Sequence, residues 1–491
     1  MKKENLSRIF LRVMCITLTV IMCLALGACG EKSTSSEITI GDNEEYEGID
    51  ATVGGDTVSK TTSTSSKKGG KTDKGGTSTN PDLDWMASIP KKYQGKSVTF
   101  AVWGDENATE YAKVIKLFTK KTKINVKWVT YNEEKYVSTI VTQNAVGKGP
   151  DIVINNMTFP TSVEAVQELP AIFNVNDGFW DPRVTEQLSY KGKKYFVNSY
   201  KSPIPTGGAF VFYNKQIFSN NNITSPQDYV DQGNWTFESL LKCYRDAHAK
   251  GFDGGSFQPH VVWTATGAGL INYDPKTGTF SNGLNDASQR SDIISSLKNC
   301  TTMLKEGITT NSAVNRFSTG NMAIIIQTNF GFKYNGWFKG MTPSSLGVVE
   351  MPSTFNGKKA NCYGGSQRAY GIGKNASAES AEMAYYVLRF FLDIDNYADA
   401  NADIFLNKNL ERFYKDTYLP HYKSGTLKIE YMTTPLNLVG SPWSSTSSGT
   451  WKDLFDKNAV PEEIETDLMS RKNIVDNACA TANEKIQSAA K

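Results

Sequence analysis

The chain has 491 residues, with 53 lysine and arginine residues against 50 aspartate and glutamate residues. This length suits about two to four domains and allows a substantial core to be buried. The formal net charge of +3 is too small to indicate a polyanion such as nucleic acid as the partner of the whole chain. Only three histidines occur, which argues against histidine-built metal sites and most histidine-dependent catalysis.

The amino terminus has the pattern of an exported bacterial protein. Basic residues precede an apolar stretch at 13–28, which is too short for a comfortable membrane span and has the length of a secretory h-region. Residues 26–30 read Leu-Gly-Ala-Cys-Gly and resemble the lipobox of bacterial lipoproteins. The resemblance implies that residues 1–28 are a signal peptide and that Cys29 is multiply acylated, with palmitate among its lipids, because stable anchoring needs more than one chain. An ordinary signal peptide and a retained anchor helix are the alternatives.

Residues 29–83 form the anchor and a linker of serine, threonine, glycine, lysine and aspartate. This composition has too few large apolar residues to order itself. A flexible coil of about 50 residues reaches roughly 40 Å, so we expect a tether that holds the folded part clear of the membrane. The linker's lysines could also touch anionic lipid or wall polymer, but a solvated spacer is favoured.

The folded region opens with alternating strands and helices. Alternate apolar residues predict strands at 98–102 and 124–128, a short apolar run predicts a buried strand at 151–154, and apolar stripes predict helices at 111–118 and 136–141. Asn107 or Thr109 is the expected cap of the first helix. Such an order predicts a parallel sheet covered on both faces. Ligands of these sheets bind beyond the carboxyl ends of the strands, which selects residues 103–107 and 155–159.

Two helical segments are expected later in the chain. Apolar residues spaced over 384–391 predict a helix with Ser377 as its cap, and the tail from 451 to 491 has a helical composition.

Several motifs, in register along the chain, resemble bacterial extracellular solute-binding proteins of family 1, the maltodextrin-binding kind. They lie at 147–153, 190–197, 212–218, 234–240, 317–323, 347–352 and 371–381. Each is weak alone, and together they are spread in register between about residues 97 and 391.

The resemblance implies an α/β chain with the two-lobed, type II periplasmic-binding-protein fold, each lobe built on a mainly parallel sheet flanked by helices. The first lobe would comprise residues 84–205 and 370–420, and the second residues 206–369 and 421–491. We expect hinge crossings at 203–209, 364–370 and 421–426. Paired glycines in the first two crossings suit a hinge because glycine tolerates large backbone changes.

No motif of a hydrolase, nucleotide-binding enzyme or zinc enzyme occurs in the sequence, so we expect a binding protein and not an enzyme. Glycoside hydrolysis needs only two carboxylates, and Asp105 with Glu106 is the alternative that sequence spacing leaves open. No cofactor and no metal are expected, although calcium sites assembled from distant loops give no signal in a sequence.

A sugar site needs flat aromatic faces together with planar amides or carboxylates. Both kinds of side chain occur at the predicted strand ends, in the small-residue loop after residue 263, and on the second crossing. Residues 329–330 and 441–445 match places where the resembled family puts polar and stacking residues, although phenylalanine stands at 330 where tryptophan is common. The candidate ligand-binding residues are Trp103, Asp105, Glu106, Asn107, Asn155, Asn156, Trp263, Asn329, Phe330, Gly365, Gln367, Arg368 and Trp443.

Core packing is the alternative for every tryptophan. It is preferred for Trp128, Trp180 and Trp235, whose contexts are a strand interior, an apolar loop and a helix start. A peptide would also suit asparagine-rich and tryptophan-rich strand ends, so a peptide ligand stays open.

Four cysteines follow the anchor, and no two are spaced as a zinc or redox pair. Cys243, Cys300, Cys362 and Cys479 are expected to be buried thiols, with one or two disulfides as an alternative outside the cell.

These observations predict a lipid-anchored, monomeric solute-binding protein on the extracytoplasmic face of the cell membrane. It would bind a carbohydrate, an oligosaccharide in the first instance, and deliver it to the transmembrane subunits of an ABC permease. The permease is implied by the family resemblance alone. A polysaccharide-acting surface enzyme and a surface protein without a transport role are the alternatives.

Overall fold

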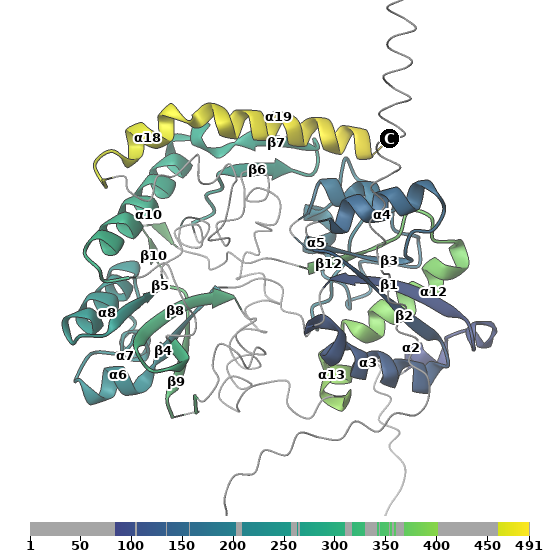
Figure 1. Cartoon of the computed structure of the whole chain (residues 1–491), viewed down its shortest axis with the longest axis horizontal. Coiled ribbons are helices and arrows are strands. Elements are labelled where there is room, and N and C mark those ends of the chain that lie inside the picture. Colours follow the sequence, from purple (N-terminus) through teal and green to yellow (C-terminus); the bar gives the residue numbers. More distant parts are fainter. Residues whose placement is uncertain are drawn as a thin grey trace, which may run out of the picture. The chain divides into compact units, whose positions relative to one another are not determined.

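The computed structural model describes residues 84–103, 106–133, 135–156, 158–202, 209–256, 263, 266–309, 317–328, 341–342, 344–352, 354–355, 358–359, 368–400 and 460–490 (Figure 1). The predicted lipidation site Cys29, the linker and most of each predicted crossing lie outside these residues. Among the helices that the structure describes, none is both long enough and apolar enough to cross a bilayer.

The first sheet has the strand order β12-β3-β1-β2. Its strands are β1 (Ser97–Trp103), β2 (Asn125–Tyr131), β3 (Ile152–Asn156) and β12 (Arg368–Ile372). Strand β1 is parallel to β2 and β3, whereas β12 returns antiparallel to β3. The predicted strand–helix–strand order and the mainly parallel sheet are therefore confirmed for this part of the chain.

Helices cover both faces of the first sheet (Figure 1). Its flanking elements are α2 (Asp84–Ala87), η1 (Lys91–Tyr93), α3 (Glu106–Thr122), α4 (Tyr136–Ala145), η2 (Thr161–Ala165), α5 (Pro182–Gln187), α12 (Ala378–Phe391) and α13 (Ile394–Ala400). Helix α3 begins at Glu106, so Asn107 and Thr109 lie inside the helix and their prediction as caps is wrong. Ser377 does cap α12, and its hydroxyl accepts the N–H of Ser380 at 3.0 Å.

Aromatic side chains fill the space between the first sheet and α12. Phe100 packs against Trp128 at a ring distance of 4.9 Å and edge-on against Phe391 at 5.3 Å. Both Phe100 and Phe391 are almost fully buried, and aromatic pairs of this geometry add to the free energy gained by burial. The core role preferred from the sequence for Trp128, Trp180 and Trp235 is confirmed, because all three indoles are buried.

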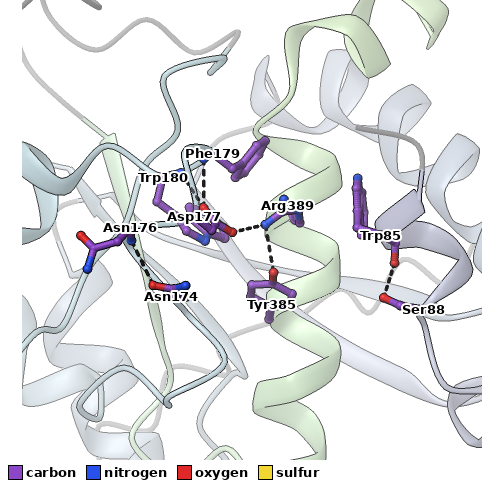
Figure 2. A network of polar contacts seen from close by, with 9 residues as sticks. All are labelled: Trp85, Ser88, Asn174, Asn176, Asp177, Phe179, Trp180, Tyr385 and Arg389. Atoms are coloured by element: carbon purple, nitrogen blue, oxygen red, sulfur yellow. Dashed lines mark hydrogen bonds and ion pairs between the residues drawn. The ribbon is translucent and has the colours of Figure 1, made fainter. Parts of the chain in front are cut away.

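The first described helix, α2, is attached to α12. Trp85 stacks parallel to Tyr386, with 6.4 Å between ring centroids. The guanidinium of Arg389 lies 5.7 Å from the Trp85 ring and donates to the Asp177 carboxylate and to the Tyr385 hydroxyl, as Figure 2 shows. These contacts hold the start of the folded region against the first sheet's helical layer.

The second sheet has the order β5-β8-β4-β9. Its strands are β4 (Ala209–Asn214), β5 (Asp253–Ser256), β8 (Met322–Thr328) and β9 (Leu346–Glu350), with helices α6 (Lys215–Asn220), α7 (Pro226–Asp231), α8 (Phe237–Ala249) and α10 (Ala287–Lys305) and the short pair β10 (Thr354–Phe355) and β11 (Lys358–Lys359). Strand β4 is antiparallel to both β8 and β9, and only β5 with β8 is parallel. This sheet differs from the mainly parallel one expected. The connection between the parallel strands β5 and β8 contains the long helix α10, whereas β4 pairs with strands that lie far along the chain, so its direction does not follow from a single strand–helix–strand unit.

A hairpin and the carboxyl-terminal helices pack on the first lobe's core. The elements are β6 (Ile271–Asp274), β7 (Thr279–Asn282), η3 (Gly283–Asn285), α18 (Ile464–Ser470) and α19 (Lys472–Ala489). The Tyr273 hydroxyl donates to the carbonyl of Ser189 at 2.6 Å, and Asn483 of α19 exchanges two hydrogen bonds with the backbone of Phe280. Their apolar residues belong to the same buried cluster as the first sheet. The cluster thus includes residues that the sequence assigned to the second lobe.

The described cysteines agree with the prediction of buried thiols. Cys243, Cys300 and Cys479 are buried thiols, and burial raises the pKa of each to about 12. Cys362 lies outside the described residues.

Candidate functional site

The carboxyl ends of the parallel strands β1, β2 and β3 meet along one edge of the first sheet, where the antiparallel strand β12 begins. In the strand register, Trp103 of β1 pairs with Tyr131 of β2, and Arg368 of β12 pairs with Asn156 of β3. Phe100 pairs with Ile152, and three residues further along both parallel strands Trp103 comes level with Asn155. The register therefore brings together three residues that the sequence selected: Trp103, Asn155 and Arg368.

Trp103 is held between an aromatic ring and a guanidinium group. Its indole is 6% exposed and meets the Tyr136 ring edge-on, with 5.1 Å between centroids. The Cζ atom of Arg368 lies 5.1 Å from the indole centroid, a cation–π distance. Because the guanidinium and Tyr136 both contact the indole, a sugar ring could stack on it only after a local rearrangement.

Tyr136 fixes the position of β1 relative to β3. Its hydroxyl donates to the carbonyl of Ala101 at 3.1 Å and accepts the N–H of Ile154 at 3.0 Å. Burial raises the pKa of Tyr136 far above its usual value, and burial likewise raises the pKa of Tyr131 to about 12. Both hydroxyls are therefore neutral hydrogen-bonding groups at physiological pH.

Arg368 is the first residue of β12 and is 9% exposed. Its Nη1 donates to the Tyr111 hydroxyl at 3.0 Å, and its carbonyl accepts Nδ2 of Asn198 at 2.6 Å. A buried guanidinium presents several donors in a fixed plane, which suits hydroxyl and carboxylate oxygens. The arrangement can thus orient an oxygen-rich ligand at this edge.

Asn155 supplies an amide at the end of β3. Its side chain is fully buried, and Oδ1 accepts the hydroxyls of Thr158 at 3.1 Å and Ser162 at 2.9 Å. Its Nδ2 has no hydrogen-bond partner. A buried donor of this kind is costly unless something accepts from it, and because the side chain is fully buried, a bound molecule could reach the two N–H groups of Nδ2 only after a local rearrangement.

The other candidate residues fall into three groups. Glu106 and Asn107 lie in the first turn of α3, and Asn156 ends β3. Trp263 is 1% exposed and belongs to the core cluster with Leu270 and Leu284, which favours the packing alternative for its ring. Asp105, Asn329, Phe330, Gly365, Gln367, Trp443 and the lipidation site Cys29 lie outside the described residues.

Sequence reasoning missed the polar partners of this edge. Tyr111 was read as part of an apolar stripe, yet its hydroxyl contacts Arg368. Thr158 lies in the selected range 155–159, but no role follows for it from the sequence. Asn198 and Ser162 lie outside the selected ranges, and polar residues in loops are too common to single them out.

In the ranges that the structure covers, no group of three or more histidine, cysteine, aspartate or glutamate residues could hold a metal ion. The described side chains at this edge are aromatic rings, the Arg368 guanidinium, the amides of Asn155 and Asn198 and the hydroxyls of Thr158 and Ser162.

Comparison with known proteins identifies the family that the chain matches. The family model for bacterial extracellular solute-binding proteins matches residues 113–406, more than half of the chain. None of the curated protein sequences matches it.

Solved structures of binding proteins share the fold. A cyclo/maltodextrin-binding protein complexed with maltotetraose is 17% identical, with 79% of this chain and 97% of that chain covered and a TM-score of 0.51. An ABC transporter solute-binding protein from Thermotoga lettingae bound with alpha-D-tagatose is 16% identical, with 80% and 100% covered and a TM-score of 0.51. Maltose-bound MalE3 of T. maritima is 14% identical, with 79% and 99% covered and a TM-score of 0.50. At these identities the likeness shows the fold, and the expected two-lobed α/β fold is confirmed.

Proposed function

Because the chain belongs to the bacterial extracellular solute-binding proteins, we propose that it captures a carbohydrate between its two lobes and delivers it to an ABC permease. An oligosaccharide is the favoured ligand. Binding would stabilise the closed protein only through contacts that the ligand makes with both lobes at once.

The observation that carries the proposal is the polar and aromatic edge of the first sheet. Trp103 and Asn155 lie level at the carboxyl ends of β1 and β3, and Arg368 begins the antiparallel strand β12 at the same edge, where ligands of such sheets bind. The guanidinium and the free Nδ2 of Asn155 donate hydrogen bonds, and sugar hydroxyls accept them. The sugars in the three similar structures support the same ligand class.

The remaining candidates complete the proposed site. We assign the rest of the first lobe's contribution to Asp105, Glu106, Asn107 and Asn156, and the second lobe's to Trp263, Asn329, Phe330 and Trp443, with Gly365 and Gln367 on the crossing between them. Trp263 is the weakest member, because its ring is buried in the core.

We propose that Cys29 carries the lipid anchor and that the folded part works on the extracytoplasmic face of the membrane. The lipobox-like run at 26–30 and the polar linker after it support this placement. Metabolic labelling with a palmitate analogue tests it: wild-type chain should be labelled and Cys29→Ala should not.

A thermal-shift screen tests the ligand class. The chain from residue 29, with Cys29→Ser to prevent acylation, is mixed with mono- and oligosaccharides and, as controls, short peptides, amino acids and polyamines. A ligand at about 100 times its dissociation constant adds roughly 2.7 kcal/mol to the free energy of unfolding, which is a shift of a few degrees for a chain of this size.

A sugar that shifts the melting temperature and is recovered unchanged would support capture for transport. A shift with peptides and none with sugars would contradict the carbohydrate assignment. Turnover of a glycoside that is lost in Asp105→Asn or Glu106→Gln would favour the surface enzyme instead.

A further inference from the structure

Helix α3 presents a lysine-rich outer face. From residue 111 to residue 132 the sequence contains six lysines and no aspartate or glutamate. Four exposed lysines lie on one side of the helix and just past its end: Lys113, Lys116, Lys120 and Lys123. We call these four residues the basic face. On a chain whose net charge is only +3, this is a strong local concentration of positive charge.

Acidic residues flank the lysine run in the sequence, at Glu110 and Glu133, and none lies within it. In the part of the chain that the structure describes, none of the four lysines takes part in an ion pair. Two acidic residues of the neighbouring α12 and α13 are engaged elsewhere: Glu379 pairs with Lys96 at 2.7 Å and Asp395 with Lys201 at 3.7 Å.

This charge pattern opposes the stability of the helix. Lysines three and four residues apart, as at 113, 116 and 120, repel one another on a helix surface. Only lysines in the last turn gain from the helix dipole, and Lys113 and Lys116 lie before that turn. A partner outside the fold would account for keeping all four charges.

The basic face lies where the linker enters the fold. The turn after η1 is joined to the end of α3, because the N–H of Gly95 donates to the carbonyl of Lys123 at 2.7 Å. Exposed Lys91 and Lys92 on η1 extend the positive surface toward α2, the first described helix. Fewer than ten residues therefore separate the start of the described chain at Asp84 from Lys91, the first lysine of this extended surface.

We propose that the basic face docks the folded protein on the anionic phospholipid surface of its own membrane. The inference rests on the proposed lipid anchor, which confines the folded part within reach of the headgroups. Lysines near an anionic bilayer each strengthen binding by about fivefold, and the tether removes the need for high affinity. Docking would keep the first lobe near the bilayer and raise its local concentration around a membrane partner.

Vesicle co-sedimentation tests the proposal. The protein is the chain from residue 29 with Cys29→Ser, so that no covalently attached lipid contributes to binding. The vesicles contain phosphatidylcholine alone or phosphatidylcholine with about 30 mol % phosphatidylglycerol. The wild-type surface should prefer the anionic vesicles and release them as salt rises from about 25 to 300 mM, because screening shortens the reach of charge.

Three variants locate the binding surface. Changing the basic face together, K113Q/K116Q/K120Q/K123Q, should weaken partitioning by at least about tenfold. The matched control K250Q/K276Q/K305Q/K374Q removes the same charge from exposed lysines elsewhere and should stay within about twofold. Replacing the four face lysines by arginine should also preserve binding, and melting curves confirm that each variant is folded.

Three results would overturn the proposal. The first is that the wild type shows no preference for anionic vesicles. The second is that the control variant loses as much vesicle binding as the glutamine variant of the basic face. The third is that the glutamine variant binds as well as the wild type, which would assign the effect to the linker lysines. Binding to a purified poly(glycerol phosphate) wall polymer without binding to vesicles would likewise reject the membrane as partner. Because the chain tested is not acylated, these outcomes are separate from the labelling of Cys29.

Discussion

The polar groups at the two ends of the first sheet differ in how completely they are hydrogen-bonded. At the amino end, the Asp151 carboxylate accepts the N–H of Thr99 at 2.8 Å and its hydroxyl at 2.7 Å, and the N–H of Asp151 donates back to that hydroxyl at 2.9 Å. At the carboxyl end, Nδ2 of Asn155 has no partner, and the guanidinium of Arg368 covers an indole.

The difference separates polar groups that hold the fold from polar groups that serve a ligand. A closed set of hydrogen bonds, as around Asp151, contributes stability and offers nothing to a bound molecule. An edge with an unfilled donor costs stability and is kept where function needs it. The following predictions use variants at the two ends to break or sharpen this contrast.

Arg368→Leu should have the largest effect. Removing hydrogen bonds from a charged donor should lower ligand affinity by about 10- to 100-fold, measured by isothermal titration with the sugar found in the screen. The free energy of unfolding should change little, because an apolar side chain of similar volume often replaces a buried charge at low cost. Arg368→Lys keeps the charge but loses the planar arrangement of donors, so its ligand affinity should lie between those of the wild type and Arg368→Leu. Wild-type affinity in Arg368→Leu would remove this residue from the site.

Asp151→Ala should show the opposite pattern at the amino end. The N–H and hydroxyl of Thr99 lose their acceptor, so the free energy of unfolding should fall by about 1–3 kcal/mol in guanidinium denaturation. Ligand affinity should not change. A loss of affinity without a loss of stability would show that the two ends do not divide their roles in this way.

Asn155→Ala should have a smaller, mixed effect. Its Oδ1 no longer accepts the hydroxyls of Thr158 and Ser162, which should cost about 1 kcal/mol of unfolding free energy. Loss of the Nδ2 donor should lower affinity by about threefold to tenfold. Ser162→Ala is the matched control, since it removes one of the same hydrogen bonds and leaves Nδ2 in place. Equal affinity losses in the two variants would exclude a ligand role for Nδ2.

The smallest effect concerns alkaline pH at the carboxyl end. Burial raises the pKa of Tyr131 from 10.0 to about 12. Below pH 10 both folded and unfolded chains keep the phenolic proton, and its contribution to stability is complete. Between pH 10 and 12 only the unfolded chain releases it, so stability should fall as pH rises. Urea midpoints from pH 9 to 11 should decline less steeply in Tyr131→Phe than in the wild type, and parallel curves would contradict the assignment.

Local patterns made much of the first sheet predictable. Alternation and apolar stripes are short-range signals, and they located β1, β2, β3, α3, α4 and α12. The direction of β4 was not accessible in this way. Its neighbours β8 and β9 lie more than 100 residues further along the chain, with several helices and strands between them, so no short-range signal sets their pairing.

Residues of the candidate site were predictable where a general rule links a position in the sequence to ligand binding. The strand-end rule selected Trp103 and Asn155, and the family resemblance added Arg368. The contact of Arg368 with Tyr111 joins residues 257 positions apart, and spacing says nothing about such a pair. The burial of Trp263 was equally hidden, because it depends on the packing of the 266–297 segment and the carboxyl-terminal helices onto the first lobe's core.

The central claim is that the carboxyl edge of the first sheet binds the carbohydrate. A crystal structure of the complex with the sugar identified in the screen tests it most directly. The account predicts a sugar oxygen within hydrogen-bonding distance of Nδ2 of Asn155 or of the Arg368 guanidinium, with the Asp151–Thr99 hydrogen bonds unchanged. A sugar bound elsewhere, with neither group in contact, would contradict it.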